Sequence, residues 1–383
     1  MRQLPPLAAI LILGSLIFAG NAPASGEKSR QLRFSGDGRY ILAQDGSAIT
    51  VLTVQPLSIL FRVPAANAAL ARFSPDSSEV LYVSGVPRTD AAQLALASSP
   101  ARVERWNIAD RSRTKSDDVA LQGCETVELA PNGRTVVCVD TLGTLRLIQV
   151  DPKRTLLEKK KFGVQFYSGT PQRPCYDAVK KSPCNYGDPG SAMVGFSQDS
   201  HFLIAEPWRA DGDALAYDLV NSKPVTLEGR LKKLTQLRRL GPTPIPFAFV
   251  GPERVLLPGY GKPPGEHVIN AAVVTFPSGE VVSRTTLPPS QQLFSAADPN
   301  YVLVHPFGKA SVEMVRSENS TSITLKYPDR TAAVEFGTGQ IIVTEGAALD
   351  VFGPLYVAER TNGEIGLYRR GRGIQAAVSL TQP

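Results

Sequence analysis

A repeated unit runs along the chain and constrains its fold more than any other feature. In each copy an apolar residue precedes a short polar turn, and a β-branched or aromatic run follows. The turns lie at 34–38, 73–77, 129–133 and 196–200, with degenerate copies near 249–253, 294–300 and 351–354. Asp, Asn, Gly and Pro supply the turn geometry, so each copy predicts two antiparallel strands joined by a tight turn.

A second predicted hairpin follows each of the first. Its inner strands read as apolar runs at 49–52, 103–106, 145–148, 214–217, 271–274, 332–335 and 365–368. The units begin near 31, 70, 126, 192, 246, 292 and 348. Units of about 51 residues are slightly longer than a compact propeller blade, and they leave no second domain to assign.

The expected fold is therefore all-β, a seven-bladed β-propeller of four-stranded antiparallel blades that occupies 25–383 as a single domain. An irregular sandwich or two stacked β domains are the alternative, because many short, evenly spaced strands also build sandwiches.

Two phrases within the repeat carry a family resemblance. The phrase Phe-Ser-Pro-Asp at 73–76 and the strand Tyr-Asp-Leu at 217–219 resemble the WD40-like and YVTN-type β-propellers of secreted bacterial proteins. The chain departs from the eukaryotic pattern, because it has neither a Gly-His nor a Trp-Asp dipeptide. The pairs 106–107 (Trp-Asn) and 217–218 (Tyr-Asp) stand where Trp-Asp would. The resemblance implies a fold and does not imply a function.

The first 24 residues are typical of a secretory signal peptide. Arg2 precedes an apolar run from Leu7 to Gly20, and 22–24 read Ala-Pro-Ala. The run is short for a membrane span, which needs roughly 20 residues, so an uncleaved anchor is the less favoured interpretation. No Cys directly follows the apolar core, which argues against a lipid-anchored lipoprotein. We expect cleavage after Ala24 and a secreted or periplasmic protein.

Export implies an oxidising compartment, where paired cysteines are expected. Cys124 and Cys138 are centred on position 131, so we expect them to face each other across one hairpin. Cys175 and Cys184 are near neighbours in the longest predicted loop, and proximity pairs them. Cys-x-x-Cys spacing is absent, so all four are interpreted as structural rather than as metal or redox groups.

Loop lengths indicate which face of the propeller is functional. In a propeller, the loops between strands two and three of a blade open on the same face as the loops between blades. All the long predicted loops belong to this set, namely 85–101, 162–192, 206–213, 229–246 and 258–267. Function gathers on loops held by a rigid scaffold, although crossovers also tolerate length at little thermodynamic cost. The candidate binding-face residues are Tyr176, Asp188, Glu206, Trp208, Arg209, Asp211, Asp213 and His267.

Catalytic signatures are weak. The sequence has no Gly-x-Ser-x-Gly motif and only three His, and its carboxylates follow no calcium-loop pattern. We therefore expect a non-catalytic scaffold that binds a protein or peptide partner, with no cofactor, no metal and no catalytic residue. The alternative is a propeller enzyme, a lactonase-like hydrolase or a quinone-cofactor dehydrogenase, with its site at the channel mouth.

Charge adds little to the choice of partner. The formal net charge is +6, which is too small to indicate that the protein binds nucleic acid. We expect a monomer. The segment 230–240 alternates Leu with Lys and Arg. As a helix it would suit an anionic membrane surface; as a crossover, its leucines would cover the propeller edge.

Overall fold

The computed structural model describes most of the chain beyond the first 30 residues. The described ranges are 31–45, 47–65, 68–85, 101–121, 124–140, 143–162, 175–177, 182–184, 192–207, 213–232, 247–258, 269–287, 290–298, 300–306, 314–317, 320–323, 332–336, 341–343, 349–360 and 362–380. The expected signal peptide lies outside them, and no helix in these ranges is long and apolar enough to cross a membrane.

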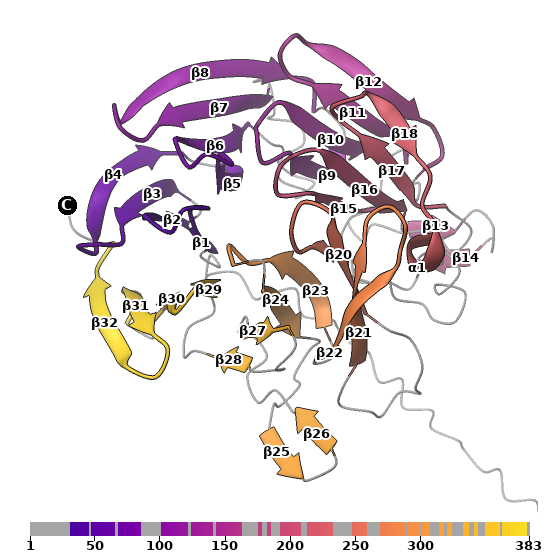
Figure 1. Cartoon of the computed structure of the whole chain (residues 1–383). Coiled ribbons are helices and arrows are strands. Elements are labelled where there is room, and N and C mark those ends of the chain that lie inside the picture. The colour runs from indigo at the N-terminus through magenta and orange to yellow at the C-terminus, as the bar shows by residue number, and fades with distance from the viewer. Residues whose placement is uncertain are drawn as a thin grey trace, which may run out of the picture.

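Four-stranded antiparallel sheets stand side by side around a common centre, and the first strand of each lies nearest that centre (Figure 1). Numbered in chain order, sheets one to three comprise β1 (Gln31–Phe34), β2 (Tyr40–Gln44), β3 (Ala48–Thr53) and β4 (Ser58–Pro64); β5 (Ala69–Phe73), β6 (Glu79–Ser84), β7 (Ala101–Asn107) and β8 (Ser112–Val119); and β9 (Cys124–Leu129), β10 (Thr135–Asp140), β11 (Leu145–Gln149) and β12 (Arg154–Lys159).

Sheets four to seven continue the ring. They comprise β15 (Ala192–Phe196), β16 (Phe202–Pro207), β17 (Leu215–Asp218) and β18 (Lys223–Val225); β19 (Ala248–Phe249), β20 (Arg254–Pro258), β21 (Ile269–Thr275) and β22 (Val281–Leu287); β23 (Ser290–Ser295), β24 (Tyr301–Pro306), β27 (Ala332–Glu335) and β28 (Ile341–Val343); and β29 (Leu349–Phe352), β30 (Leu355–Glu359), β31 (Ile365–Arg369) and β32 (Gly373–Val378). The all-β propeller of four-stranded antiparallel sheets is confirmed.

The prediction of a seven-bladed propeller on one uniform plan is wrong, because the chain forms six regular blades. Six sheets take four strands that follow one another in the chain, whereas the sheet that begins with β23 is interrupted. The separate hairpin β25 (Met314–Ser317) and β26 (Ser320–Ile323) stands between its second and third strands. The predicted long loops omitted this connection, because the apolar repeat resumes at 332 and gives no sign of how far the chain departs before it.

Two further elements lie outside the four-stranded sheets. The hairpin β13 (Cys175–Asp177) and β14 (Ser182–Cys184) precedes sheet four, and its register places Cys175 directly opposite Cys184. The helix α1 (Gly229–Lys232) is a single turn after sheet four, where the sequence predicted an all-strand propeller. Leu231 of α1 is fully buried, which supports packing of this segment against the propeller edge.

Buried apolar clusters fill the interfaces between neighbouring sheets. Side chains alternate across each strand, so every sheet presents one apolar face to the preceding sheet and one to the next. Phe34 and Ile41 of sheet one pack with Val357 and Leu367 of sheet seven, for example, while Leu42 packs towards sheet two. No strand of the described ranges is shared between sheets one and seven, so side-chain packing and a hydrogen bond from the Phe34 backbone N–H to Asp350 close the ring.

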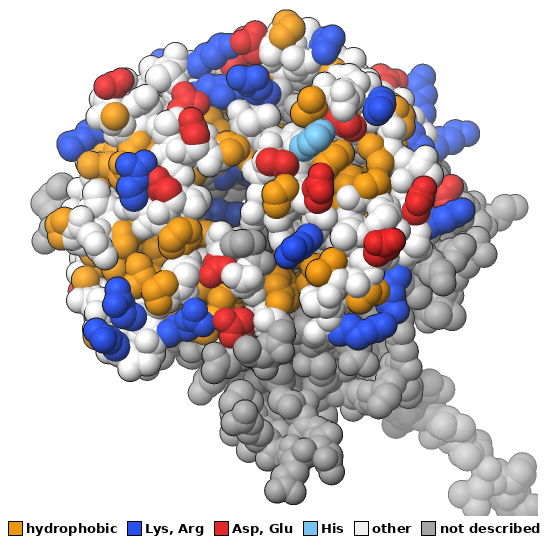
Figure 2. Space-filling view, viewed as in Figure 1, with side chains coloured by type: hydrophobic (Ala, Val, Ile, Leu, Met, Phe, Trp, Pro, Cys, Tyr) orange, Lys and Arg blue, Asp and Glu red, His pale blue; other side chains and the backbone are white. Residues whose placement is uncertain are grey.

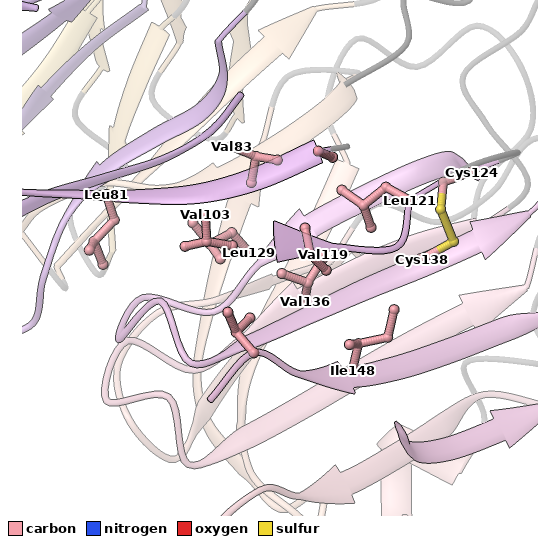
Figure 3. Packing of buried hydrophobic residues seen from close by; sticks show 12 residues of the cluster. Leu81, Val83, Val103, Val119, Leu121, Cys124, Leu129, Val136, Cys138 and Ile148 are labelled. Carbon is pink, nitrogen blue, oxygen red and sulfur yellow. A yellow bond between two sulfur atoms is a disulfide. The ribbon is translucent and has the colours of Figure 1, made fainter. Parts of the chain in front are cut away.

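The interface between sheets two and three contains a disulfide bond (Figure 3). Cys124 and Cys138 are bonded, as predicted, with their Cα atoms 5.5 Å apart. The register differs from the expectation, because Cys138 lies opposite Val127 and Cys124 lies opposite Asp140. An irregularity at the start of β9 shifts the register and brings the diagonal pair together.

Candidate functional site: two faces and a charged channel

The two faces of the ring differ in the length of their connections. Between the first and second strands of each sheet, and between the third and fourth, the connections contain only two to five residues. We call the face that carries them the turn face. Short connections keep the ends of neighbouring strands together, so this face is a rigid frame.

A recurrent hydrogen-bond arrangement explains why the Phe-Ser-x-Asp phrase repeats. The Ser35 hydroxyl donates to Asp37 Oδ1 (2.7 Å) and accepts from the Tyr40 backbone N–H (2.9 Å), which fixes the turn between β1 and β2. The same arrangement occurs around Ser74 with Asp76 and around Ser197 with Asp199. These three serines are buried, and their hydroxyls are engaged in the turn. The repeated phrase is thus a turn lock, which gives these residues a structural role.

The connections longer than five residues join strands at the opposite face, and we call it the insertion face. One of them, 226–247, begins by running back to the turn face, where the backbone N–H groups of Glu228 and Arg230 donate to Pro277 and Gly279 in the turn between β21 and β22. The long connections leave and rejoin the described strands at the same edge of the ring. They span 85–100, 160–191, 208–214, 226–247, 259–268 and 307–331. All but the first belong to the arc from sheet three to sheet six.

The structure describes few of the predicted binding-face residues. Glu206 lies near the end of β16, on the insertion face, with no exposed surface. Asp213 is exposed, directly before β17. Tyr176 lies in β13, while the remaining candidates, Asp188, Trp208, Arg209, Asp211 and His267, fall outside the described residues.

A layer of charged side chains lines the channel, and the sequence analysis missed it. Arg33, Arg72, Glu128 and Asp350 occupy equivalent positions on the first strands of sheets one, two, three and seven. The same layer holds Gly195 in sheet four and Ala248 in sheet five. The charged positions therefore form one continuous arc over four adjoining sheets. Arg33 and Arg72 both directly precede a Phe-Ser pair, a signal from which the layer could have been inferred.

The charged groups of this arc are not equally satisfied. Arg72 forms an ion pair with Glu128 across the boundary between sheets two and three. The Asp350 carboxylate accepts hydrogen bonds from three backbone N–H groups, those of Phe34 (2.7 Å), Val351 (2.8 Å) and Ala297 (3.1 Å). The Arg33 guanidinium has no hydrogen bond or ion pair to any residue that the structure describes.

Burial and neighbouring charges shift the pKa values of two of these groups. Burial raises the pKa of Asp350 to about 6, and the three backbone donors and the Arg33 charge only partly offset this. Burial, followed by repulsion from Arg72, lowers the pKa of Arg33, while Asp350 and Glu128 act in the opposite direction. A guanidinium remains protonated at neutral pH, so Arg33 is a charged group that Asp350 and Glu128 attract without a hydrogen bond to its donors.

A separate charged pocket of about 460 Å³ lies on the turn face between sheets two and three. Arg105 is held there by backbone carbonyls of Asn132 and Gly133, and Lys115 is paired with Asp151 and Asp117. These groups compensate one another, so the pocket has no clear preference for ligand charge. Within the described part of the chain, no group of three His, Cys, Asp or Glu residues could hold a metal ion.

These features define a class: the chain is a β-propeller with a rigid turn face and an elaborated insertion face. No protein-family model and no curated protein sequence matches it. Among solved structures, hydrazine synthase from Kuenenia stuttgartiensis is similar over 89% of this chain and 95% of its own, with a TM-score of 0.49 and 10% identity. The Cps50 (Swd1) β-propeller domain from Myceliophteria thermophila is similar over 89% and 96%, with a TM-score of 0.48 and 11% identity.

Proposed function

We propose that this chain is a binding scaffold whose insertion face engages a protein or peptide partner. The observation that carries the proposal is that every connection longer than five residues joins strands across the insertion-face edge of the ring, although the described start of 226–247 runs back to the turn face. Insertions placed without functional constraint would be found on both faces. A rigid ring that displays variable connections on one side is the usual arrangement of a recognition surface.

The distribution of the long connections around the ring supports a single, localised contact area. Five of the six lie on the arc from sheet three to sheet six, and they include the connection that contains β13 and β14. Sheets one and seven are joined to their neighbours by short connections on the same face. A partner would therefore engage one side of the insertion face, off the axis of the channel.

We further propose that the protein acts outside the reducing cytoplasm. The Cys124–Cys138 disulfide supports this, because disulfides persist in oxidising compartments and are rare where thiols are kept reduced. Intact-mass measurement of the protein recovered from its source cells tests the export signal. Cleavage after Ala24 is expected, and a full-length chain in the soluble cytoplasmic fraction would contradict it.

Site-specific photo-crosslinking tests the binding proposal. A photoreactive residue replaces Tyr176 or Asp213 on the insertion face, and Val220 on the turn face serves as the matched control, since it is 70% exposed. Discrete crosslinked species are expected in cells from the two insertion-face positions and not from Val220. Crosslinks from Val220 alone, or from none of the three positions, would overturn the assignment.

A further inference from the structure

We infer that the central channel binds a singly charged carboxylate group through Arg33. This inference concerns the channel rather than the insertion face and does not depend on the proposed partner. The space-filling view shows a hollow at the centre of the turn face with basic side chains inside it (Figure 2). Arg33 and Arg72 are the arginines that the strand register places on the channel layer.

Among the described charged residues of the arc, Arg33 is the one whose guanidinium has no hydrogen bond or ion pair. It lies on β1, the innermost strand of sheet one, and is only partly buried, so a ligand in the channel can reach its guanidinium. Glu128 pairs with Arg72, and Asp350 accepts hydrogen bonds from three backbone amides, so Asp350 attracts Arg33 without accepting a hydrogen bond from it. A guanidinium with unused donors in a confined site matches the two oxygens of a carboxylate, which it can bind through two parallel hydrogen bonds.

The rest of the arc selects the charge of the ligand. Glu128 and Asp350 flank the two arginines in the order Asp350, Arg33, Arg72, Glu128 around the ring. A dianion such as phosphate bound at Arg33 would be repelled by both carboxylates about twice as strongly as a monoanion, because the repulsion scales with the charge of the ligand. The charges therefore favour a carboxylate over a phosphate.

The described part of the opposite channel wall is apolar. In the same layer, sheet four contributes Gly195 and sheet five contributes the buried Ala248. A Cβ added at Gly195 would lie 2.9 Å from the Phe247 ring, so that ring packs directly against the glycine. A carboxylate attached to a small apolar group fits this division into a charged arc and an uncharged arc.

Calorimetric titration of the whole folded protein with benzoate tests the inference. Binding to the wild type is expected with a dissociation constant on the order of 1 mM. Arg33→Gln is expected to weaken benzoate binding roughly tenfold or more, because a charge-assisted hydrogen-bonded pair is lost. Arg39→Gln is the matched control, since Arg39 follows the same strand but is exposed and paired with Asp37 in the turn. Absence of benzoate binding to the wild type, or equal binding by Arg33→Gln, overturns the inference.

If circular dichroism shows that Arg33→Gln does not fold, a second variant, Glu128→Gln, tests benzoate binding in the channel. Glu128→Gln removes a repelling carboxylate and releases Arg72, so benzoate should bind several-fold more tightly and phosphate should begin to bind. Unchanged or weaker benzoate binding by this variant overturns the inference, as does tighter binding of phosphate than of benzoate by the wild type. A blocked dipeptide with a free carboxylate, compared with its amide, distinguishes a peptide C-terminus from a free organic acid as the source of the group.

Discussion

The Asp350 carboxylate of sheet seven accepts a 2.7 Å hydrogen bond from the backbone N–H of Phe34 in sheet one, 316 positions away in the chain. Its other oxygen accepts from the backbone N–H of Ala297, just after the first strand of sheet six. One buried side chain thus connects three neighbouring sheets where the ring closes. A buried carboxylate in this position makes closure sensitive to pH.

Replacing Asp350 with Asn should reduce the pH dependence of stability. The folded-state pKa of Asp350 is raised from 3.8 to about 6, so the folded protein binds this proton more tightly than the unfolded chain does. Its contribution is complete below pH 3.8 and is lost as the pH rises to about 6. The loss amounts to about 3 kcal/mol of unfolding free energy, because the side chain is buried and solvent screens it little.

Urea unfolding of the wild type and of Asp350→Asn across this pH range gives the unfolding free energy at each pH. The effect is the difference between the slopes of unfolding free energy against pH for the two proteins. Asp76→Asn is an informative comparison of opposite sign. Hydrogen bonds from Ser74 and from the Ser78 backbone N–H hold the pKa of Asp76 below its usual value, so its stabilisation is lost as the pH falls. Identical slopes for the wild type and Asp350→Asn would rule out the assigned shift.

Removing the disulfide should destabilise the protein by about 3 kcal/mol, since its two cysteines are separated by 14 positions and close a loop of that size in the unfolded chain. The double variant Cys124→Ser/Cys138→Ser is compared with the wild type by chemical denaturation. Addition of a reductant should bring the wild type to the stability of the reduced variant, and any effect of the reductant on the variant itself would come from the predicted Cys175–Cys184 pair. Equal stability of the oxidised wild type and the oxidised double variant would show that the Cys124–Cys138 bond does not stabilise the fold.

Two glycines with the same backbone conformation should respond differently to alanine. Gly38 and Gly371 have φ values of 70° and 72°, which alanine adopts only with strain. A Cβ at Gly38 would lie 2.2 Å from the Phe352 ring of the neighbouring sheet seven, whereas no atom lies within 4 Å of one at Gly371. We expect Gly371→Ala to cost about 1 kcal/mol and Gly38→Ala about 2–4 kcal/mol in unfolding free energy. Equal costs would mean that the Phe352 contact is absent in solution.

The buried leucine of the basic segment should matter more than its charges. Leu231 packs with Phe202, Phe249 and Phe276, so Leu231→Ala is expected to cost about 2–5 kcal/mol. The adjacent Lys232 is exposed, and Lys232→Glu should change stability by less than about 0.5 kcal/mol. Thermal unfolding distinguishes the two. A larger loss for Lys232→Glu would show that charge, rather than packing, anchors this segment.

The features that the sequence predicted well are local ones. The turn around Ser35 and Asp37 is fixed by bonds within six residues, so its hairpin is predictable from the repeated phrase. The Cys124–Cys138 pairing is also local, although the irregular start of β9 altered its register. The channel arc was not foreseen, because the meeting of Asp350 with Phe34 depends on closure of the whole ring. Sequence alone also gave no boundary for the interruption that contains β25 and β26.

Closure without a shared strand also governs the order in which the protein can mature on the ribosome. Leu32, Phe34 and Ile41 are synthesised early, yet their packing partners Val357, Leu367 and Leu380 emerge last. Each intermediate sheet can pack on its predecessor as it appears, but the outer flank of the first sheet stays uncovered throughout elongation. Nascent chains are therefore most vulnerable to misassociation at that flank, and release of the final sheet is the event that ends this exposure.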